Sequence, residues 1–184
     1  LDIPMLLLLL LSVHFSYRAF LFRHRRDYLL AGLLVGLAAS SKYTGLVGLV
    51  PLAMAMLFSR GRKEHLFSIL IGLVAIVLGF VLGTPFAVVS PKEFGPQFAA
   101  EFGHYSGGHA GAEGDSWLWY IKYLLIDSEG PMVILALAGM LWGFCSRDSR
   151  GLLIASCPVV YYLTMSLFKV HFARTAVPLV PFLA

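Results

Sequence analysis

The sequence predicts an all-α protein, a polytopic bundle of transmembrane helices with one long extracytoplasmic loop. Of its 184 residues, 59% are hydrophobic and 13% are charged, whereas soluble domains carry about 25% charged residues. The apolar residues form runs of membrane-spanning length, and the basic residues gather in short clusters between them. This composition argues against a soluble enzyme and a disordered chain. It also argues against a nucleic-acid partner, despite the net charge of +4.

Seven membrane segments are predicted within one transmembrane domain that covers residues 1–184. A spanning helix needs about 20 apolar residues, and several runs approach this length. Two runs on either side of Lys42 are shorter, so they predict either two short spans or a re-entrant hairpin. The polar stretch 84–130 is predicted to be the loop. The seven segments are 3–22, 28–41, 46–58, 66–83, 131–146, 151–168 and 175–184, the last of them truncated.

The distribution of Lys and Arg predicts the orientation of these segments. Loops 23–27, 59–65 and 147–150 hold three, three and two basic residues, so the positive-inside rule places them in the cytoplasm. Asp2, Lys42 and the 84–130 loop then share the extracytoplasmic side of a plasma (inner) membrane. Because the chain starts at Leu1 and stops within an apolar run, we expect it to be an internal fragment of a longer protein.

Small residues predict where helices approach one another closely. Glycines four residues apart occur at Gly32 and Gly36, at Gly79 and Gly83, and at Gly139 and Gly143. This spacing lets the backbones of membrane helices come together. These pairs therefore predict helix packing, with no chemical role.

Two charged residues lie close to predicted membrane segments. Lys42 stands between the two short runs, where an unpaired charge costs a few kcal/mol, so we expect a partner or a watery cavity for it. It either extends toward the membrane surface or forms an anion site, with neighbouring hydroxyl groups and the start of the next helix. Asp2 opens the first segment before Pro4, either as a helix cap or as a metal or substrate ligand at the outer rim.

The 84–130 loop holds Glu101, His104 and His109 in a glycine-rich stretch. These residues predict either an ordinary solvated loop or a site for a divalent cation, although their spacing fits no fixed metal motif. The stretch 116–123, which is rich in Trp and Tyr, predicts a helix at the membrane interface.

Three potential cations, Lys169, His171 and Arg174, lie within six residues between two apolar runs. They are either ordinary loop charges or a site for a phosphate group, which Arg binds as a planar fork and Lys as a point charge. Pro178 and Pro181 are expected to kink or shorten the following helix. Motifs of soluble enzymes, such as the P-loop, GxSxG and HExxH, are absent from the sequence. The sequence thus predicts an outward-facing site for an anionic group such as a lipid phosphate.

Four stretches in order resemble one family. They are DIPM at 2–5, YLLAGLLVGLAASSKYTG at 28–45, HYSGGHAG at 104–111 and FARTAVPLVP at 172–181. Together they resemble the polytopic GT-C glycosyltransferases, in particular the protein O-mannosyltransferase-like and aminoarabinose transferase-like members. The resemblance implies transfer of mannose or another hexose or pentose. The donor is a polyprenyl-phosphate sugar in the bilayer, and the acceptor is a protein, lipid or glycan on the outer face.

The resemblance also implies roles for individual residues. Lys42 and Arg174 would hold the donor phosphate, with Lys169 and His171 as helpers. Asp2 would be the secondary acidic residue of the catalytic site, and Asp2 and His109 are the candidate ligands if a divalent metal ion is used. The expected substrate-loop residues are Tyr43, Glu101, His104 and His109. The family's main catalytic carboxylate would lie upstream of residue 1, so the fragment alone is expected to be inactive.

Other classes of membrane protein stay open. A membrane transporter or a noncatalytic subunit that handles an anionic lipid or glycan would also suit broken helices and cations. A ligase or polymerase of lipid-linked glycans would share the donor chemistry. The polar outer loop and the lack of an inverted repeat in the hydropathy favour the transferase.

Overall fold

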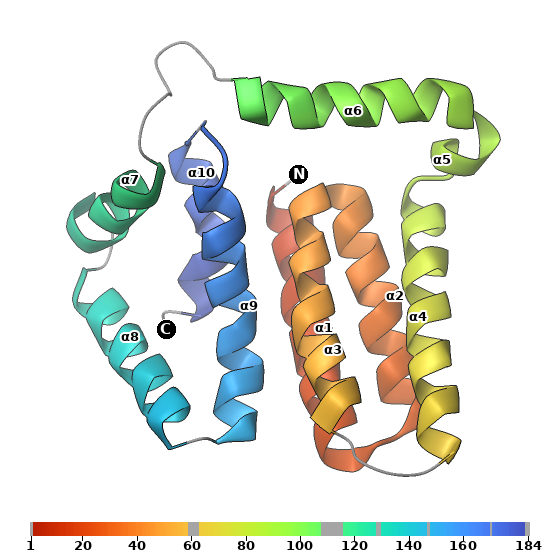
Figure 1. Cartoon of the computed structure of the whole chain (residues 1–184), viewed down its shortest axis with the longest axis horizontal. Coiled ribbons are helices and arrows are strands. Elements are labelled where there is room, and N and C mark those ends of the chain that lie inside the picture. Colours follow the sequence, from red (N-terminus) through yellow and green to blue (C-terminus); the bar gives the residue numbers. More distant parts are fainter. Residues whose placement is uncertain are drawn as a thin grey trace. The chain divides into compact units, whose positions relative to one another are not determined.

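The computed structural model of the chain describes residues 2–58, 63–107, 116–127, 130–146, 148–169 and 171–182. These residues are helical or lie in the short turns between helices, with no strand among them (Figure 1). The predicted all-α class is therefore confirmed. The chain forms two compact units, Leu1–Val89 and Ser90–Ala184.

The first unit is built around helix α2. Its elements are α1 (Asp2–Phe22), α2 (Arg25–Ser41), the 3₁₀ segment η1 (Tyr43–Gly48), α3 (Leu49–Phe58), α4 (Lys63–Gly83) and the short α5 (Phe86–Val89). Helix α2 packs against α1 on one side and α4 on the other, and α3 packs against α1. Apolar side chains such as Met5, Leu9 and Leu52 are fully buried between them.

Buried hydroxyl groups in α1 are satisfied within the helix itself. Ser12 donates to the carbonyl of Leu9, and Ser16 donates to the carbonyl of Ser12. Neither serine exposes any surface. These bonds remove the cost of burying a polar group without a partner.

Glycines bring the backbones of α2 and α4 into direct contact. A Cβ added at Gly36 would lie 2.1 Å from the carbonyl oxygen of Ile76, and one at Gly79 would lie 2.2 Å from that of Leu33. A Cβ at Gly32 would be equally close to the carbonyl of Gly72. The packing role predicted for the first two glycine pairs is thus confirmed. The third pair differs, since a Cβ at Gly139 would meet nothing within 4 Å.

The second unit contains a run of shorter and longer helices. Its elements are α6 (Pro91–Gly107), α7 (Ser116–Lys122), the π-helical turn η2 (Tyr123–Asp127), α8 (Gly130–Cys145), α9 (Ser149–Ser166), α10 (Ala173–Ala176) and the 3₁₀ segment η3 (Val177–Phe182). The predicted shortening near Pro178 and Pro181 is confirmed, because α10 gives way to η3 within four residues.

Much of the stretch 84–130 is helical, where the sequence predicted a loop. Helix α6 begins at Pro91, which suits the first turn of a helix, and Glu93 lies in that turn. Phe94 and Phe98 stack one turn apart, with ring centroids 6.0 Å apart. Average hydropathy is a poor guide to such a mixed helix, because its polar residues lower the mean. The side of the membrane on which the stretch lies stays a prediction.

Two helices in the described part of the chain are long and apolar enough to cross a membrane, Asp2–Phe22 and Leu66–Gly83. A third would be added if Ser116–Ile126 and Gly130–Cys145 form one bent span. The predicted segment 28–41 falls within α2, and 46–58 falls within η1 and α3. Segments 131–146 and 151–168 overlap α8 and α9, which end at Cys145 and Ser166. Their insertion as separate spans stays a prediction, as does the choice between two short spans and a re-entrant hairpin around Lys42.

We expect Gly36→Ala to destabilise the protein, because the added methyl group would collide with backbone atoms of α4 that cannot rotate away. Overpacking of this kind costs about 1–3 kcal/mol. The effect is measured by heating the protein in detergent. The monodisperse peak that remains in size-exclusion chromatography at each temperature reports the folded fraction.

Gly139→Ala is the matched control, because the same methyl group would meet open space there. It should be neutral or gain up to about 1 kcal/mol from the higher helix propensity of alanine. Equal losses in the two variants would contradict the close contact between α2 and α4.

Candidate functional site

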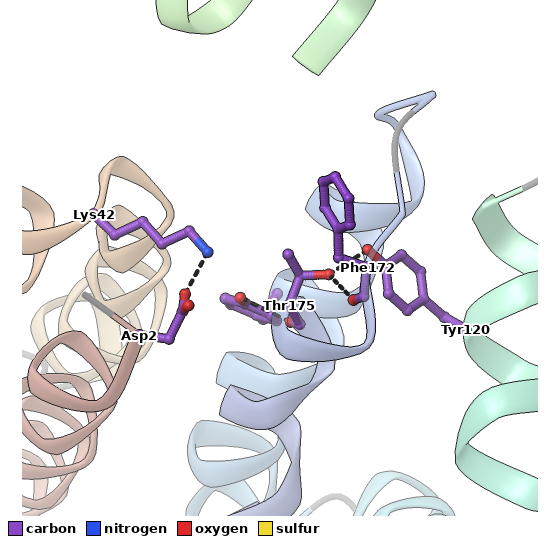
Figure 2. Close-up of polar contacts among 6 residues, drawn as sticks. Asp2, Lys42, Tyr120, Phe172 and Thr175 are labelled. Carbon is purple, nitrogen blue, oxygen red and sulfur yellow. Dashed lines mark hydrogen bonds and ion pairs between the residues drawn. The ribbon is translucent and has the colours of Figure 1, made fainter. Parts of the chain in front are cut away.

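Lys42 and Asp2 form an ion pair in the first unit. The Nζ atom of Lys42 donates to Oδ1 of Asp2 at 2.5 Å, across 40 residues of sequence. Both side chains are mostly buried, with 16% of Lys42 and 24% of Asp2 exposed (Figure 2). The sequence predicted either a partner or a watery cavity for Lys42, and the structure gives it a partner, Asp2.

The hairpin of α1 and α2 explains why these two residues meet. Asp2 begins α1 and Lys42 directly follows α2, so the antiparallel packing of the two helices brings these ends together. Lys42 has an extended backbone with φ of −158°, and its N–H donates to the carbonyl of Ala38 at the end of α2. A carboxylate at the start of a helix and an ammonium group at the end of one both oppose the local helix dipole. The dipoles therefore favour both charges where they are.

The immediate surroundings of Lys42 offer one further polar group. Ser40 and Ser41 both donate to the carbonyl of Leu37, so their hydroxyl protons are used by the helix. The Oγ1 atom of Thr44 is buried and has no hydrogen-bond partner among the described residues. The start of α1 and the residues that follow α2 thus supply an ammonium group, a carboxylate and an unsatisfied hydroxyl group. Tyr43, predicted to contact substrate, is half-buried beside them.

The second unit carries the other predicted cations. Lys169 and Arg174 are exposed and His171 is half-buried. The guanidinium group of Arg174 lies over the ring of Phe172 at 5.0 Å. Within the described ranges, neither Lys169 nor Arg174 has an acidic partner. Both therefore carry positive charge that no carboxylate in this part of the chain neutralises.

Hydrogen bonds between hydroxyl groups fix the segment that carries Arg174. Thr175 donates to the carbonyl of Phe172 at 2.6 Å, which leaves Tyr120 of α7 to donate to the hydroxyl oxygen of Thr175 at 2.5 Å (Figure 2). Tyr161 of α9 donates to the carbonyl of Thr175 at 3.0 Å. Since both tyrosines are almost fully buried, the backbone next to Arg174 is held from two helices.

Helix α7 also contacts the residues just before this segment. Ser116 donates to the carbonyl of Phe168 at 2.6 Å. Trp119 packs against the imidazole ring of His171, with centroids 4.5 Å apart, while the Nδ1 atom of His171 is buried and unpartnered among the described residues. Packing against the ring of Trp119 thus fixes the position of the His171 side chain. The stretch 116–123 was expected only to lie at the membrane interface. Ser116, Trp119 and Tyr120 are spaced i, i+3 and i+4, so they share one face of α7, and this spacing was the signal for the contact.

Comparison with protein families adds an independent observation. Residues 1–88 match the family model described as dolichyl-phosphate-mannose-protein mannosyltransferase. No curated protein and no solved structure matches the chain. The resemblance to GT-C transferases of the protein mannosyltransferase type, predicted from the motifs at 2–5 and 28–45, is confirmed over this range.

The mannosyltransferase match coincides with the first structural unit, which ends at Val89. It therefore contains Asp2, Lys42 and Tyr43, together with the candidate spans α1 and α4. These findings support a membrane protein whose first unit is similar to glycosyltransferases of this family. Lys169, His171 and Arg174 lie outside the matched residues, and their roles stay predictions.

The remaining predicted residues belong to the second unit or lie outside the described residues. Glu101 is exposed on α6, and His104 lies on the same helix with its side chain outside the described set. His109 lies outside the described residues. In the part of the chain that the structure describes, no three acidic, His or Cys residues cluster in a way that could hold a metal ion. Asp2 is paired with Lys42, and the metal site expected from Asp2 and His109 stays a prediction.

We expect Tyr120→Phe to loosen the segment around Arg174, because it removes the hydrogen bond to Thr175 and leaves that oxygen with one bond fewer. A buried hydrogen bond of this kind contributes about 0.5–1.5 kcal/mol. Thermal unfolding of the purified protein gives the loss of stability.

Tyr162→Phe is the matched control, since it removes a more exposed bond, from Tyr162 to the carbonyl of Trp117. Its effect should be smaller than that of Tyr120→Phe. The reverse order would show that Tyr120 does not hold this segment.

Proposed function

We propose that this protein is a membrane glycosyltransferase of the extracytoplasmic face of a plasma (inner) membrane. It would move mannose, or another hexose or pentose, from a polyprenyl-phosphate donor to a protein, lipid or glycan acceptor. The observation that carries the proposal is the Asp2–Lys42 ion pair within the segment that matches the mannosyltransferase model.

Lys42 has the chemistry to bind the donor phosphate. A phosphate oxygen and the carboxylate of Asp2 would compete for the same ammonium group, because each accepts a charge-assisted hydrogen bond. The unsatisfied hydroxyl of Thr44 could donate a second bond to the phosphate. In the transfer step, the bond between the sugar C1 and the phosphate oxygen breaks, and its electron pair stays on the phosphate. Lys42 would stabilise the charge that develops there.

Asp2 would act on the acceptor side of the reaction. Once Lys42 bonds to phosphate, the Asp2 carboxylate loses its partner and can accept a hydrogen bond from the attacking acceptor hydroxyl. The acceptor oxygen forms a bond to C1 and gives up its proton to a general base. The resemblance assigns that base to a carboxylate upstream of residue 1, so Asp2 is proposed as the secondary acidic residue that orients the acceptor.

The cations of the second unit are proposed to bind the anionic part of a substrate. Arg174 offers a planar fork of donors that suits two phosphate oxygens, and Lys169 offers a point charge. The hydroxyl network of Tyr120 and Tyr161 favours this role, because it fixes the backbone at Thr175 beside Arg174. His171 is proposed to help them, and Tyr43, Glu101, His104 and His109 to contact the sugar or acceptor.

Lys42→Ala and Arg174→Ala should each weaken binding of a polyprenyl-phosphate sugar by at least about tenfold, or about 1.4 kcal/mol. The measurement is equilibrium binding of the donor to the protein in nanodiscs. Binding is the readout because the main catalytic carboxylate is expected upstream of residue 1.

Lys92→Ala is the control, because Lys92 is an exposed lysine of α6 that has no role in the proposal. Unchanged binding in the Lys42 and Arg174 variants would remove these residues from the donor site. Failure of the unmodified protein to bind the donor would favour the transporter class.

Asp2→Asn should separate the two proposed roles of the ion pair. The variant keeps the shape of the side chain but no longer holds the ammonium group of Lys42 by charge, so donor binding should be unchanged or tighter. Sugar transfer should fall, because the amide cannot orient the acceptor hydroxyl as a carboxylate does. Donor binding and transfer are both measured on one preparation of the longer protein that carries the expected upstream carboxylate, with thermal unfolding as a check of folding. A loss of donor binding equal to that of Lys42→Ala would contradict the proposed competition.

A further inference from the structure

Three arginines and one histidine lie together where α1 ends and α2 begins. Arg23, His24, Arg25 and Arg26, which we call the arginine turn, are all exposed. This turn joins the end of α1 to the start of α2, whereas the Asp2–Lys42 pair joins the other ends of the same two helices. The arginine turn is therefore separate from the site proposed for sugar transfer.

Two candidate membrane spans end beside the arginine turn. Helix α1 ends at Phe22, directly before Arg23, and the span in α4 begins at Leu66. The guanidinium group of Arg25, in the first turn of α2, lies over the ring of Phe67 at 5.1 Å, so the arginine turn contacts the start of the span in α4. Phe22, Leu66 and Phe67 are 54%, 71% and 52% exposed. Exposed apolar rings next to cations, at the ends of two spans, are typical of the boundary between lipid chains and headgroups.

The carboxylate of Asp27, which directly follows the arginine turn, does not neutralise the positive charge of the turn. Asp27 is 1% exposed and pairs with Arg18, whose Nε atom lies 3.2 Å from Oδ1 of the carboxylate. The negative charge of Asp27 is thus paired with Arg18 inside the α1–α2 hairpin. In the described part of the chain, Arg23 and Arg26 have no acidic partner.

The backbone of Arg23 adds a second observation. Its φ of 57° is the only positive value among the non-glycine residues described, and its N–H donates to the carbonyl of Ala19 to close the end of α1. Glycine is the usual residue at such a position, because a Cβ atom is disfavoured in the left-handed region. An arginine here accepts backbone strain that glycine would avoid, which points to a use for its charge.

We propose that the arginine turn binds the phosphate headgroup of an anionic phospholipid in the adjoining leaflet. The arginines supply the donors for the phosphate, and the exposed side chains of Phe22, Leu66 and Phe67 contact the first part of its acyl chains. A phosphate ion free in water would gain nothing from these apolar neighbours, so the lipid is the favoured partner. The site goes beyond the proposed sugar transfer and does not depend on it.

The test measures binding of fluorescent phosphatidylglycerol to the detergent-solubilised full chain, with fluorescent phosphatidylcholine for comparison. Each basic residue near an anionic lipid surface strengthens binding about fivefold. Arg23→Gln with Arg26→Gln should therefore weaken binding of phosphatidylglycerol by about thirtyfold. Added salt should reduce the difference between the variant and the unmodified protein.

Lys92→Gln with Arg150→Gln is the matched control, because it removes the same two charges from exposed positions elsewhere. It should leave binding unchanged. An equal loss in this control, or equal binding of phosphatidylcholine by the unmodified protein, would overturn the proposal. Displacement of the fluorescent lipid by inorganic phosphate as efficiently as by unlabelled phosphatidylglycerol would overturn the choice of a lipid.

Arg23→Gly separates lipid binding from folding. Glycine removes the backbone strain at this position, so the thermal stability should be kept or raised, while binding of phosphatidylglycerol should weaken about fivefold. Unchanged binding in this well-folded variant would overturn the role of Arg23.

Discussion

The close contact between the backbones of α2 and α4 is the constraint on which the rest of the first unit depends. Helices in a bilayer gain little from burying apolar surface against each other, so they associate through tight packing and polar contacts. The glycines at 32, 36, 72 and 79 allow that packing. Because α2 is fixed between α4 and α1, its final residues have a defined position, and Lys42 reaches Asp2 from there.

Charge pairing secures the α1–α2 hairpin at both of its ends. At one end the cation, Lys42, follows α2 and the carboxylate, Asp2, belongs to α1. At the other end the cation, Arg18, belongs to α1 and the carboxylate, Asp27, to α2. A charge left unpaired in such surroundings would be costly. The carboxylate of Asp2 is more exposed than that of Asp27. This exposure suits the proposed displacement of the Asp2 carboxylate from Lys42 by a substrate anion.

Among the described residues of the second unit, hydrogen bonds of hydroxyl groups, and not ion pairs, hold the segment that carries Arg174. Its cation-bearing segment is too short to hold its own conformation, since α10 has only four residues. Buried hydroxyl groups from α7 and α9 supply the missing constraint through Tyr120, Tyr161 and Thr175. Such bonds are directional, so they fix the backbone beside Arg174 while its side chain stays exposed.

The sequence by itself determined the helical class, the apolar character of α1 and α4, and the family resemblance, because each depends on composition or on local patterns. It also predicted either a partner or a watery cavity for Lys42, since the cost of an unpaired charge follows from its apolar neighbours alone. Only the tertiary structure decided that the partner is Asp2, because an antiparallel hairpin joins residues that no local pattern relates. The structure alone also joined Tyr120 to Thr175 and left Gly139 without a close neighbour, since both depend on which helix faces which.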